Sequence, residues 1–116
     1  MKCPMPDERH DAASNAQAAV RWAEREFATT NLIHGRDEER GGYSIIFRTI
    51  VRTSGDPLLT VSRLLMVTLL DEFLSDHTAS EVALLLDHWE VGDTMRWAGS
   101  SQRVVVNDAG LRVEAW

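Results

Sequence analysis

Two Asp-His pairs are the residues of this 116-residue chain whose types could support acid–base catalysis or metal binding. Asp76 precedes His77, and Asp87 precedes His88. Asp87 and His88 would point about 100° apart on a helix, and the i, i+4 histidine pair of helical zinc sites is missing. There is also no Gly-x-Ser-x-Gly elbow, and Cys3 lies in no nucleophile motif. The sequence therefore predicts a non-enzymatic protein with no catalytic residue, metal or cofactor.

Acidic residues dominate the second half of the chain, whose formal net charge is −6 overall. Residues 59–116 hold nine acidic residues and four arginines, whereas residues 1–58 hold nine acidic and eight basic residues. Between Asp71 and Asp93 there are seven acidic residues and no lysine or arginine. Such a face would repel a phosphate backbone and attract a basic protein surface. The residues expected to contact such a partner are Asp87, Glu90, Asp93 and Trp116.

Length and composition predict one domain with an ordinary hydrophobic core. Hydrophobic residues make up 44% of the chain and charged residues 26%, as is usual for a soluble domain. The single cysteine excludes an internal disulfide and fits a reducing cytoplasm. Residues 1–10 contain two prolines and no apolar segment. We therefore expect a loose leader rather than a signal peptide, followed by a single domain over residues 11–116.

The stretch Asp56–Phe73 is predicted to be the element on which the rest of the chain packs. Asp56 can cap a helix, and Pro57 suits the first helical position. The apolar residues that follow recur at three- and four-residue spacing and cover most of the circumference, as in a buried helix. Arg63 interrupts the run, which is far shorter than the roughly 20 residues of a membrane span. A core helix is therefore the preferred interpretation.

Two further helices are predicted in the N-terminal half. Asp11–Thr30 is rich in alanine and has one apolar stripe. Tyr43–Thr53 is ambiguous, because its β-branched residues favour a strand and the spacing of its apolar residues favours a helix. A strand would mix Ile46 and Ile50 with two arginines on one face, so we prefer the helix. Residues 34–42 are interpreted as a polar loop between these two helices.

The C-terminal half is expected to contain two short helices and a strand. Thr78–Glu81 has capping-box spacing, so a helix begins there. Thr94 to about Ser100 follows a possible aspartate cap. Arg103–Asn107 is the clearest strand, and Leu111–Trp116 is either its hairpin partner or a short helix. The expected fold is mainly α with a small β element, namely about five helices plus a short C-terminal strand or hairpin. The tryptophans expected in the core are Trp89 and Trp97.

This order of elements resembles the winged helix-turn-helix domain, and most closely that of MarR-type transcriptional regulators. The resemblance covers residues 56–113, and only six residues separate Trp97 from Val104, where family members have a longer recognition helix and wing. The four patterns that carry it are Leu59–Leu65 (opening of the first domain helix), Thr78–Leu85 (helix before the turn), Asp93–Trp97 (start of the recognition helix) and Arg103–Gly110 (strand leaving the wing).

The resemblance implies a DNA-binding transcriptional regulator, with a homodimer contact through the Asp11–Thr30 helix. Arg96 would address guanine or phosphate, and Arg103 would reach phosphate or the minor groove. Alternatively, both arginines could pair with nearby acids such as Asp93, Glu90 or Asp108. The candidate DNA-contacting residues are Thr94, Arg96, Ser100, Ser101, Gln102 and Arg103.

The acidic run supports a second hypothesis from a different class of protein. In it the chain is an acidic protein-binding module that presents residues 71–93 to a basic protein surface. Such a module could serve as an antirepressor, or as a phage-type inhibitor of a nucleic-acid-binding machine such as an anti-CRISPR, by protein–protein contact or charge mimicry. Titration with DNA at low salt separates the two hypotheses.

Overall fold

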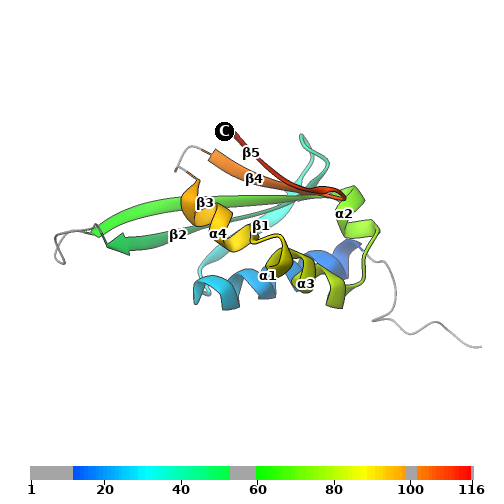
Figure 1. The fold of residues 1–116 in the computed structure, drawn as a ribbon, viewed down its shortest axis with the longest axis horizontal. Coiled ribbons are helices and arrows are strands. Elements are labelled where there is room, and N and C mark those ends of the chain that lie inside the picture. Colours follow the sequence, from blue (N-terminus) through cyan, green and yellow to red (C-terminus); the bar gives the residue numbers. More distant parts are fainter. Residues whose placement is uncertain (1–11, 53–59, 99–101, 116) are drawn as a thin grey trace, which may run out of the picture.

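A single five-stranded sheet is the largest element of the fold (Figure 1). The computed structural model describes residues 12–52, 60–98 and 102–115. Its helices are α1 (Ala12–Phe27), α2 (Asp71–Ser75), α3 (Ala79–His88) and α4 (Val91–Trp97). Its strands are β1 (Leu32–Asp37), β2 (Gly42–Arg52), β3 (Thr60–Leu70), β4 (Gln102–Asn107) and β5 (Gly110–Ala115). The strands lie in the order β1-β2-β3-β4-β5, with β3 and β4 parallel and the other neighbours antiparallel.

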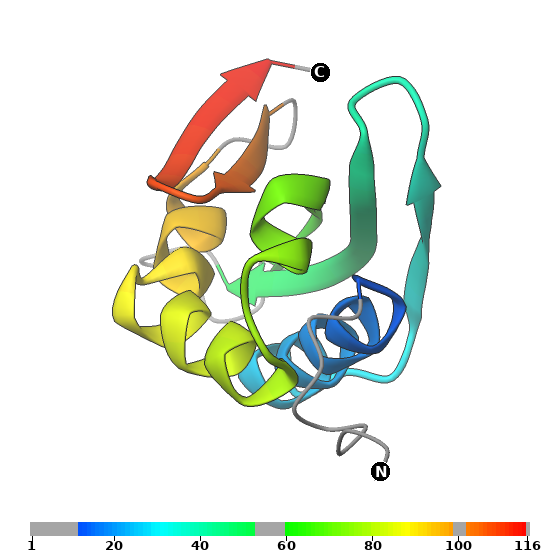
Figure 2. The ribbon, with the colours of Figure 1, turned by 90° about the vertical axis from the view of Figure 1, so that its right-hand side faces the viewer.

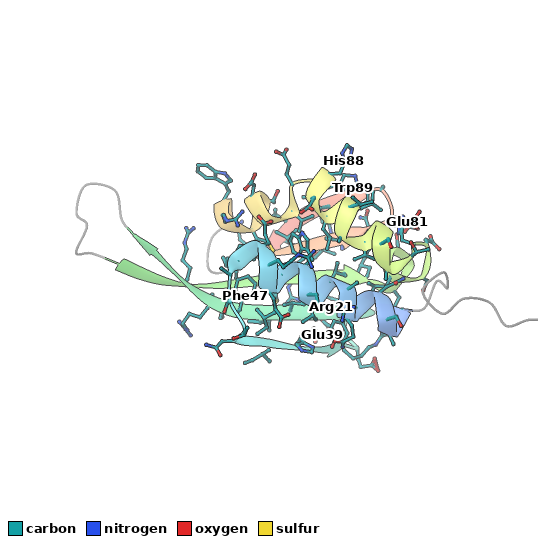
Figure 3. All side chains as sticks on the ribbon, turned by 90° about the horizontal axis from the view of Figure 1, so that it is seen from below. Arg21, Glu39, Phe47, Glu81, His88 and Trp89 are labelled. Atoms are coloured by element: carbon teal, nitrogen blue, oxygen red, sulfur yellow. The ribbon has the colours of Figure 1, made fainter. Side chains whose placement is uncertain are left out.

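Helices α1, α3 and α4 lie on one face of this sheet, and the hydrophobic core fills the space between (Figures 1 and 2). Alternate residues of β2 and β3 enter the core from the sheet, because successive strand side chains point to opposite faces. Phe47 is one of them, and its ring centroid lies 4.7 Å from that of Phe27 at the end of α1 (Figure 3). Asn15 of α1 is buried and donates hydrogen bonds to the carbonyls of Leu74 and His77, which ties α1 to the connection between α2 and α3.

The opposite face of the sheet is concave, and no helix of the described residues covers it (Figure 2). The sheet curls so far that the β1–β2 turn approaches β5. Arg40 of that turn donates from Nε to Oε1 of Glu114 over 3.1 Å, although the two residues are 74 positions apart in sequence. A second link joins Arg103 Nη1 of β4 to Asp37 Oδ2 at the end of β1, over 3.2 Å. We call these four residues the ionic clasp.

The prediction of a mainly α, winged-helix-like fold is wrong, because the sheet and not a central helix organises the chain. Of the predicted helix Asp56–Phe73, residues 60–70 form β3, and helix begins only at Asp71. β3 is the central strand and pairs with β2 on one side and β4 on the other. Leu65, Val67 and Leu69 enter the core beneath the helices, while Met66 and Thr68 are buried on the opposite face. A strand buried on both faces reads as a continuous apolar run, which periodicity does not distinguish from a buried helix.

The helix predicted over Tyr43–Thr53 is also wrong, since Gly42–Arg52 form β2. The sequence favours a helix here because a strand mixes apolar and charged residues on one face. That mixing occurs, because Ile46 and the exposed Arg48 both lie on the concave face, which no helix covers. Only the face toward the helices must be uniformly apolar, and there Ile45 and Phe47 are buried. The predicted loop is shorter than expected, because β1 continues through Asp37.

Predictions that rest on local signals agree with the structure. The alanine-rich helix is α1, which ends at Phe27 because Ala28 adopts a left-handed conformation with φ 48°. The capping box at Thr78 is present and starts α3. The valine strand is β4, and the open alternative for the C-terminal residues is decided in favour of the hairpin strand β5. The short helix is α4, which starts three residues earlier than Thr94, at Val91.

Of the two tryptophans predicted to lie in the core, one packs against it and the other is exposed. Trp89 is partly buried, packs against the core and lies with its ring centroid 5.8 Å from that of Phe73, as expected (Figure 3). Trp97 was expected in the core but is 87% exposed, so this prediction is wrong. It is the last residue of the short α4, and the core side of that helix is occupied by Val91 and Met95.

None of the helices in the described ranges combines the length and the apolar character needed to cross a membrane. The predicted leader over residues 1–10 and the Asp56 cap lie outside the described residues, as do Ser100, Ser101 and Trp116.

Candidate functional site

Arg96, the main candidate for DNA contact, is held within its own chain. Its Nη1 lies 2.9 Å from Glu26 Oε2 and 3.0 Å from Asp93 Oδ1, and its Nη2 donates to the carbonyl of Glu26 over 2.9 Å. The guanidinium carbon also lies 4.5 Å from the centroid of the Phe27 ring. The alternative prediction that Arg96 pairs with Asp93 is confirmed. Its guanidinium joins α4 to the end of α1 and is only partly available to a ligand.

Arg103 lies on the other face of the sheet and is buried, with 8% of its surface exposed. Nη1 contacts Asp37 Oδ2 and donates to Thr68 Oγ1 over 3.1 Å. Its acidic partner is therefore Asp37, and not Asp93, Glu90 or Asp108 as predicted. The other described candidates are Thr94, whose hydroxyl donates to the carbonyl of Glu90, and the exposed Gln102 at the start of β4. Among the candidates that the structure describes, Arg96 and Arg103 therefore lie on opposite faces of the sheet.

The predicted partner-binding acids do come together. Asp87, Glu90 and Asp93 line a small hollow of about 120 Å³ between α1, α3 and α4, and Glu26 completes it. We call these four residues the acidic notch. One oxygen of Asp87 accepts a 2.8 Å hydrogen bond from the indole nitrogen of the buried Trp22, which fixes this carboxylate at the edge of the hollow.

The backbone conformation between α3 and α4 places the two helices on either side of this notch. Glu90 takes a left-handed conformation with φ 54°, which turns the chain sharply between the two helices. Gly92 follows, and a Cβ atom there would lie 2.6 Å from Oε2 of Glu26. The glycine therefore allows α4 to approach the Glu26 carboxylate closely. Glu26 was not among the predicted residues, since it is 61 or more positions from the other three acids in sequence and no local signal connects them.

Trp97 lies on α4, the helix that also carries Asp93 of the acidic notch. Asp93 and Trp97 are four positions apart in α4, which places them on one side of that helix, and Glu90 directly precedes it. An indole that is 87% exposed is unusual for a large apolar side chain in a folded protein. The combined surface has an aromatic group next to fixed negative charge.

A second group of carboxylates lies at the opposite end of the fold, where α2 meets the β4–β5 turn. Glu72 Oε2 accepts a 3.3 Å hydrogen bond from the backbone N–H of Asp108. A hydrogen bond with Asp76 raises the pKa of Asp108, and burial and the negative charges of Asp76 and Glu72 act in the same direction. These exposed groups increase the negative potential of the surface, but none of them lines the acidic notch.

The ionic clasp and the concave face form a further candidate surface, which sequence analysis missed. Burial by itself would raise the pKa of Asp37, but hydrogen bonds from the Arg40 N–H, the Ser44 hydroxyl and the Arg103 guanidinium keep that pKa below its ordinary value. The Arg40 hydrogen bond lowers the pKa of Glu114, against a smaller effect of burial. Residues 34–42 looked like a solvated connection, and the partners of Asp37 and Arg40 are 66 and 74 positions away.

The Asp-His pairs do not form catalytic dyads. His77 Nδ1 hydrogen-bonds with the Phe73 carbonyl over 2.8 Å, while Asp87 accepts from Trp22 instead of His88. Figure 3 shows His88 at the outer end of α3. Within the described ranges, no three His, Cys, Asp or Glu side chains are placed to hold a metal ion.

Comparisons with protein-family models, curated proteins and solved structures found no match to this chain. The resemblance to MarR-type regulators therefore stays a prediction, without a relative to support it.

Proposed function

We propose that this chain is a cytoplasmic, non-enzymatic binding module that contacts a basic partner protein through the acidic notch and Trp97. The observation that carries this proposal is the meeting of four carboxylates, from three helices and the turn between α3 and α4, around one hollow, with the exposed indole of Trp97 on α4. Three of the four acids, Asp87, Glu90 and Asp93, are those that the sequence predicts for this role.

The charge of the notch supports a cationic ligand. Four carboxylates and one guanidinium, that of Arg96, leave three net negative charges around a hollow of about 120 Å³. A carboxylate can accept about four hydrogen bonds, and Asp87 makes one described side-chain hydrogen bond. An incoming lysine or arginine side chain therefore finds free acceptor positions and a favourable potential, which gives both specificity and fast association.

Trp97 adds a large apolar contact area to the charged surface of the notch. Tryptophan is among the residues that most often dominate the binding energy of an interface, because it buries a large rigid area. Its ring can also accept a cation on its face. A basic surface with an arginine or lysine next to an apolar contact would match both parts of this site. Nucleic-acid-binding proteins present such surfaces, in keeping with an antirepressor or an inhibitor of a nucleic-acid-binding machine.

The same observations favour protein binding over DNA binding. The guanidinium of Arg96 is shared between Glu26 and Asp93, and Arg103 is buried on the opposite face of the sheet. The net charge of −6 would weaken association with a phosphate backbone. The homodimer predicted through the first helix would need another surface, since the apolar face of α1 is buried against its own sheet.

A titration with a defined basic ligand tests the proposal. The probe is a fluorescein-labelled peptide of nine arginines, and the readout is anisotropy at 50 mM and 300 mM salt. The variant Asp87→Lys/Glu90→Lys should lower affinity at least about tenfold, equivalent to 1.4 kcal/mol. Trp97→Ala should also weaken binding at the higher salt, where the apolar contribution remains.

The control for net charge is Glu72→Lys/Asp108→Lys, which changes the charge equally at exposed sites away from both the notch and β1. It should lower affinity about twofold at most, because distant exposed charges are screened. Equal losses in both double variants would show that the peptide senses only overall charge and would refute the site. Binding to mixed duplex DNA at 50 mM salt, lost in Arg96→Ala, would favour the DNA-binding hypothesis instead.

A further inference from the structure

The free edge of β1 and the concave face beside it have the properties of a second binding surface. β1 is the outermost strand of the sheet and pairs only with β2 among the strands of the described residues. An edge strand presents unpaired N–H and C=O groups to any extended chain that approaches it. β1 has neither a proline nor a charge in its first four residues, Leu32–Gly35, so this part of the edge lacks the common devices that prevent pairing.

The concave face adds an apolar strip at this edge. Ile33, Ile46 and Met66 lie opposite one another on β1, β2 and β3, so they form one row across three strands. Ile33 is 74% exposed at the outer end of the row. The hollow above this row has a volume of about 530 Å³ and is open to solvent. A wide, open hollow buries little of a small molecule but suits a segment of extended chain.

Charge and space along β1 define the chemistry of that segment. Gly35 lies between Ile33 and Asp37 on the concave face, and a Cβ built there meets no atom within 4 Å. A large side chain of the ligand can occupy this gap. Beyond Asp37, Glu38 and Glu39 of the β1–β2 turn have side chains that are 81% and 85% exposed. Each lies near an arginine, Arg36 at 2.6 Å and Arg40 at 3.6 Å, but at this exposure both carboxylates keep acceptor positions for an incoming cation.

We propose that β1 binds an extended segment of a partner protein by strand addition, with an apolar side chain against Ile33 and a lysine or arginine near Glu38 and Glu39. Ile33 and Asp37 are four positions apart on one face, and a strand rises about 3.3 Å per residue. The ligand should therefore carry an apolar residue, a large residue and a basic residue at successive alternate positions, in either chain direction. This surface shares no residue with the acidic notch.

Selection from a random library of nine-residue peptides, displayed on phage, tests this pattern. Peptides with the alternating apolar, large and basic residues should be enriched on the full chain and not on Ile33→Arg. The enriched peptide, labelled for anisotropy, should bind Ile33→Arg at least tenfold more weakly. It should lose most of its salt dependence with Glu38→Lys/Glu39→Lys. Methylation of the peptide amides that would face β1 should abolish binding, which a side-chain contact alone would not predict.

Matched variants separate this surface from others. Val113→Arg changes an exposed apolar residue on the other edge strand, β5, and should leave affinity within about twofold. Asp87→Lys/Glu90→Lys should also leave it unchanged, so failure of the notch and failure of this site are distinguishable. No enrichment, or binding that survives both Ile33→Arg and amide methylation, overturns the proposal. A dimer that Ile33→Arg dissociates, without peptide binding, would also overturn it and assign the edge to a second copy of the chain.

Discussion

The ionic clasp provides the sharpest test of how the concave face is held together. The perturbation is Asp37→Ala, which removes the carboxylate that faces Arg103 and accepts from Ser44. Arg103 would keep Thr68 Oγ1 as its described side-chain partner, with its Nε already buried and unpartnered among the described residues. A guanidinium that is 8% exposed cannot recover its lost partner from water.

The expected cost follows from this burial. Removing one partner of a buried ion pair costs about 3–5 kcal/mol, because the remaining charge stays desolvated. This is a large part of the roughly 5–15 kcal/mol that stabilises a typical domain. For a chain of this size the melting temperature should fall by roughly 10–20 °C. The milder Asp37→Asn, which retains an oxygen acceptor, should lie between Asp37→Ala and the unchanged chain.

Urea denaturation followed by circular dichroism measures this cost, and a double-mutant cycle assigns it. Arg103→Met removes the charge on the other side, so the double variant Asp37→Ala/Arg103→Met should recover at least about 1.5 kcal/mol relative to the sum of the single variants. Glu38→Ala is the control, since Glu38 pairs with Arg36 at the surface and such pairs contribute about 0–1 kcal/mol. An Asp37→Ala cost below about 1 kcal/mol, similar to that of Glu38→Ala, would refute the reasoning.

Three further predictions concern stability. The pKa values of Asp37 and Glu114 are lower in the folded chain than in the unfolded chain. The stabilisation that these carboxylates provide is therefore complete above their unfolded pKa values of about 4 and is lost as pH falls through the folded values. Acid titration of the Glu114→Gln variant should show a shallower loss of stability below about pH 4 than the unchanged chain. Asn15→Ala should cost about 1–3 kcal/mol in urea denaturation, because one buried and one partly buried carbonyl lose their donor, and a cost near zero would show that water replaces the amide. Gly42→Ala should destabilise by about 1–3 kcal/mol, since the added Cβ would collide with the Leu69 backbone, and a melting temperature unchanged from the parent would contradict that packing.

The elements that the sequence alone determines are those specified by residues close together in the chain. The capping box starting at Thr78 defines α3 because both of its hydrogen bonds are made by residues three positions apart. The alanine-rich run predicts α1, and the valine run predicts β4, through intrinsic preference. The acidic residues Asp87, Glu90 and Asp93 were found for the same reason, since their proximity in space follows from their proximity in sequence.

Only the tertiary structure decided that the central element is a strand and which residues form the two binding surfaces. Residues 64–70 are apolar except for Thr68, a pattern that suits a buried helix and a buried strand equally well. The choice was made by pairing with β2 and β4, whose residues are distant in the chain. Glu26 joins the notch, and Arg40 meets Glu114, because folding closes long loops, and no local pattern in the sequence records such contacts. The curl that brings the β1–β2 turn to β5 creates the concave face, and that curl is a property of the assembled sheet.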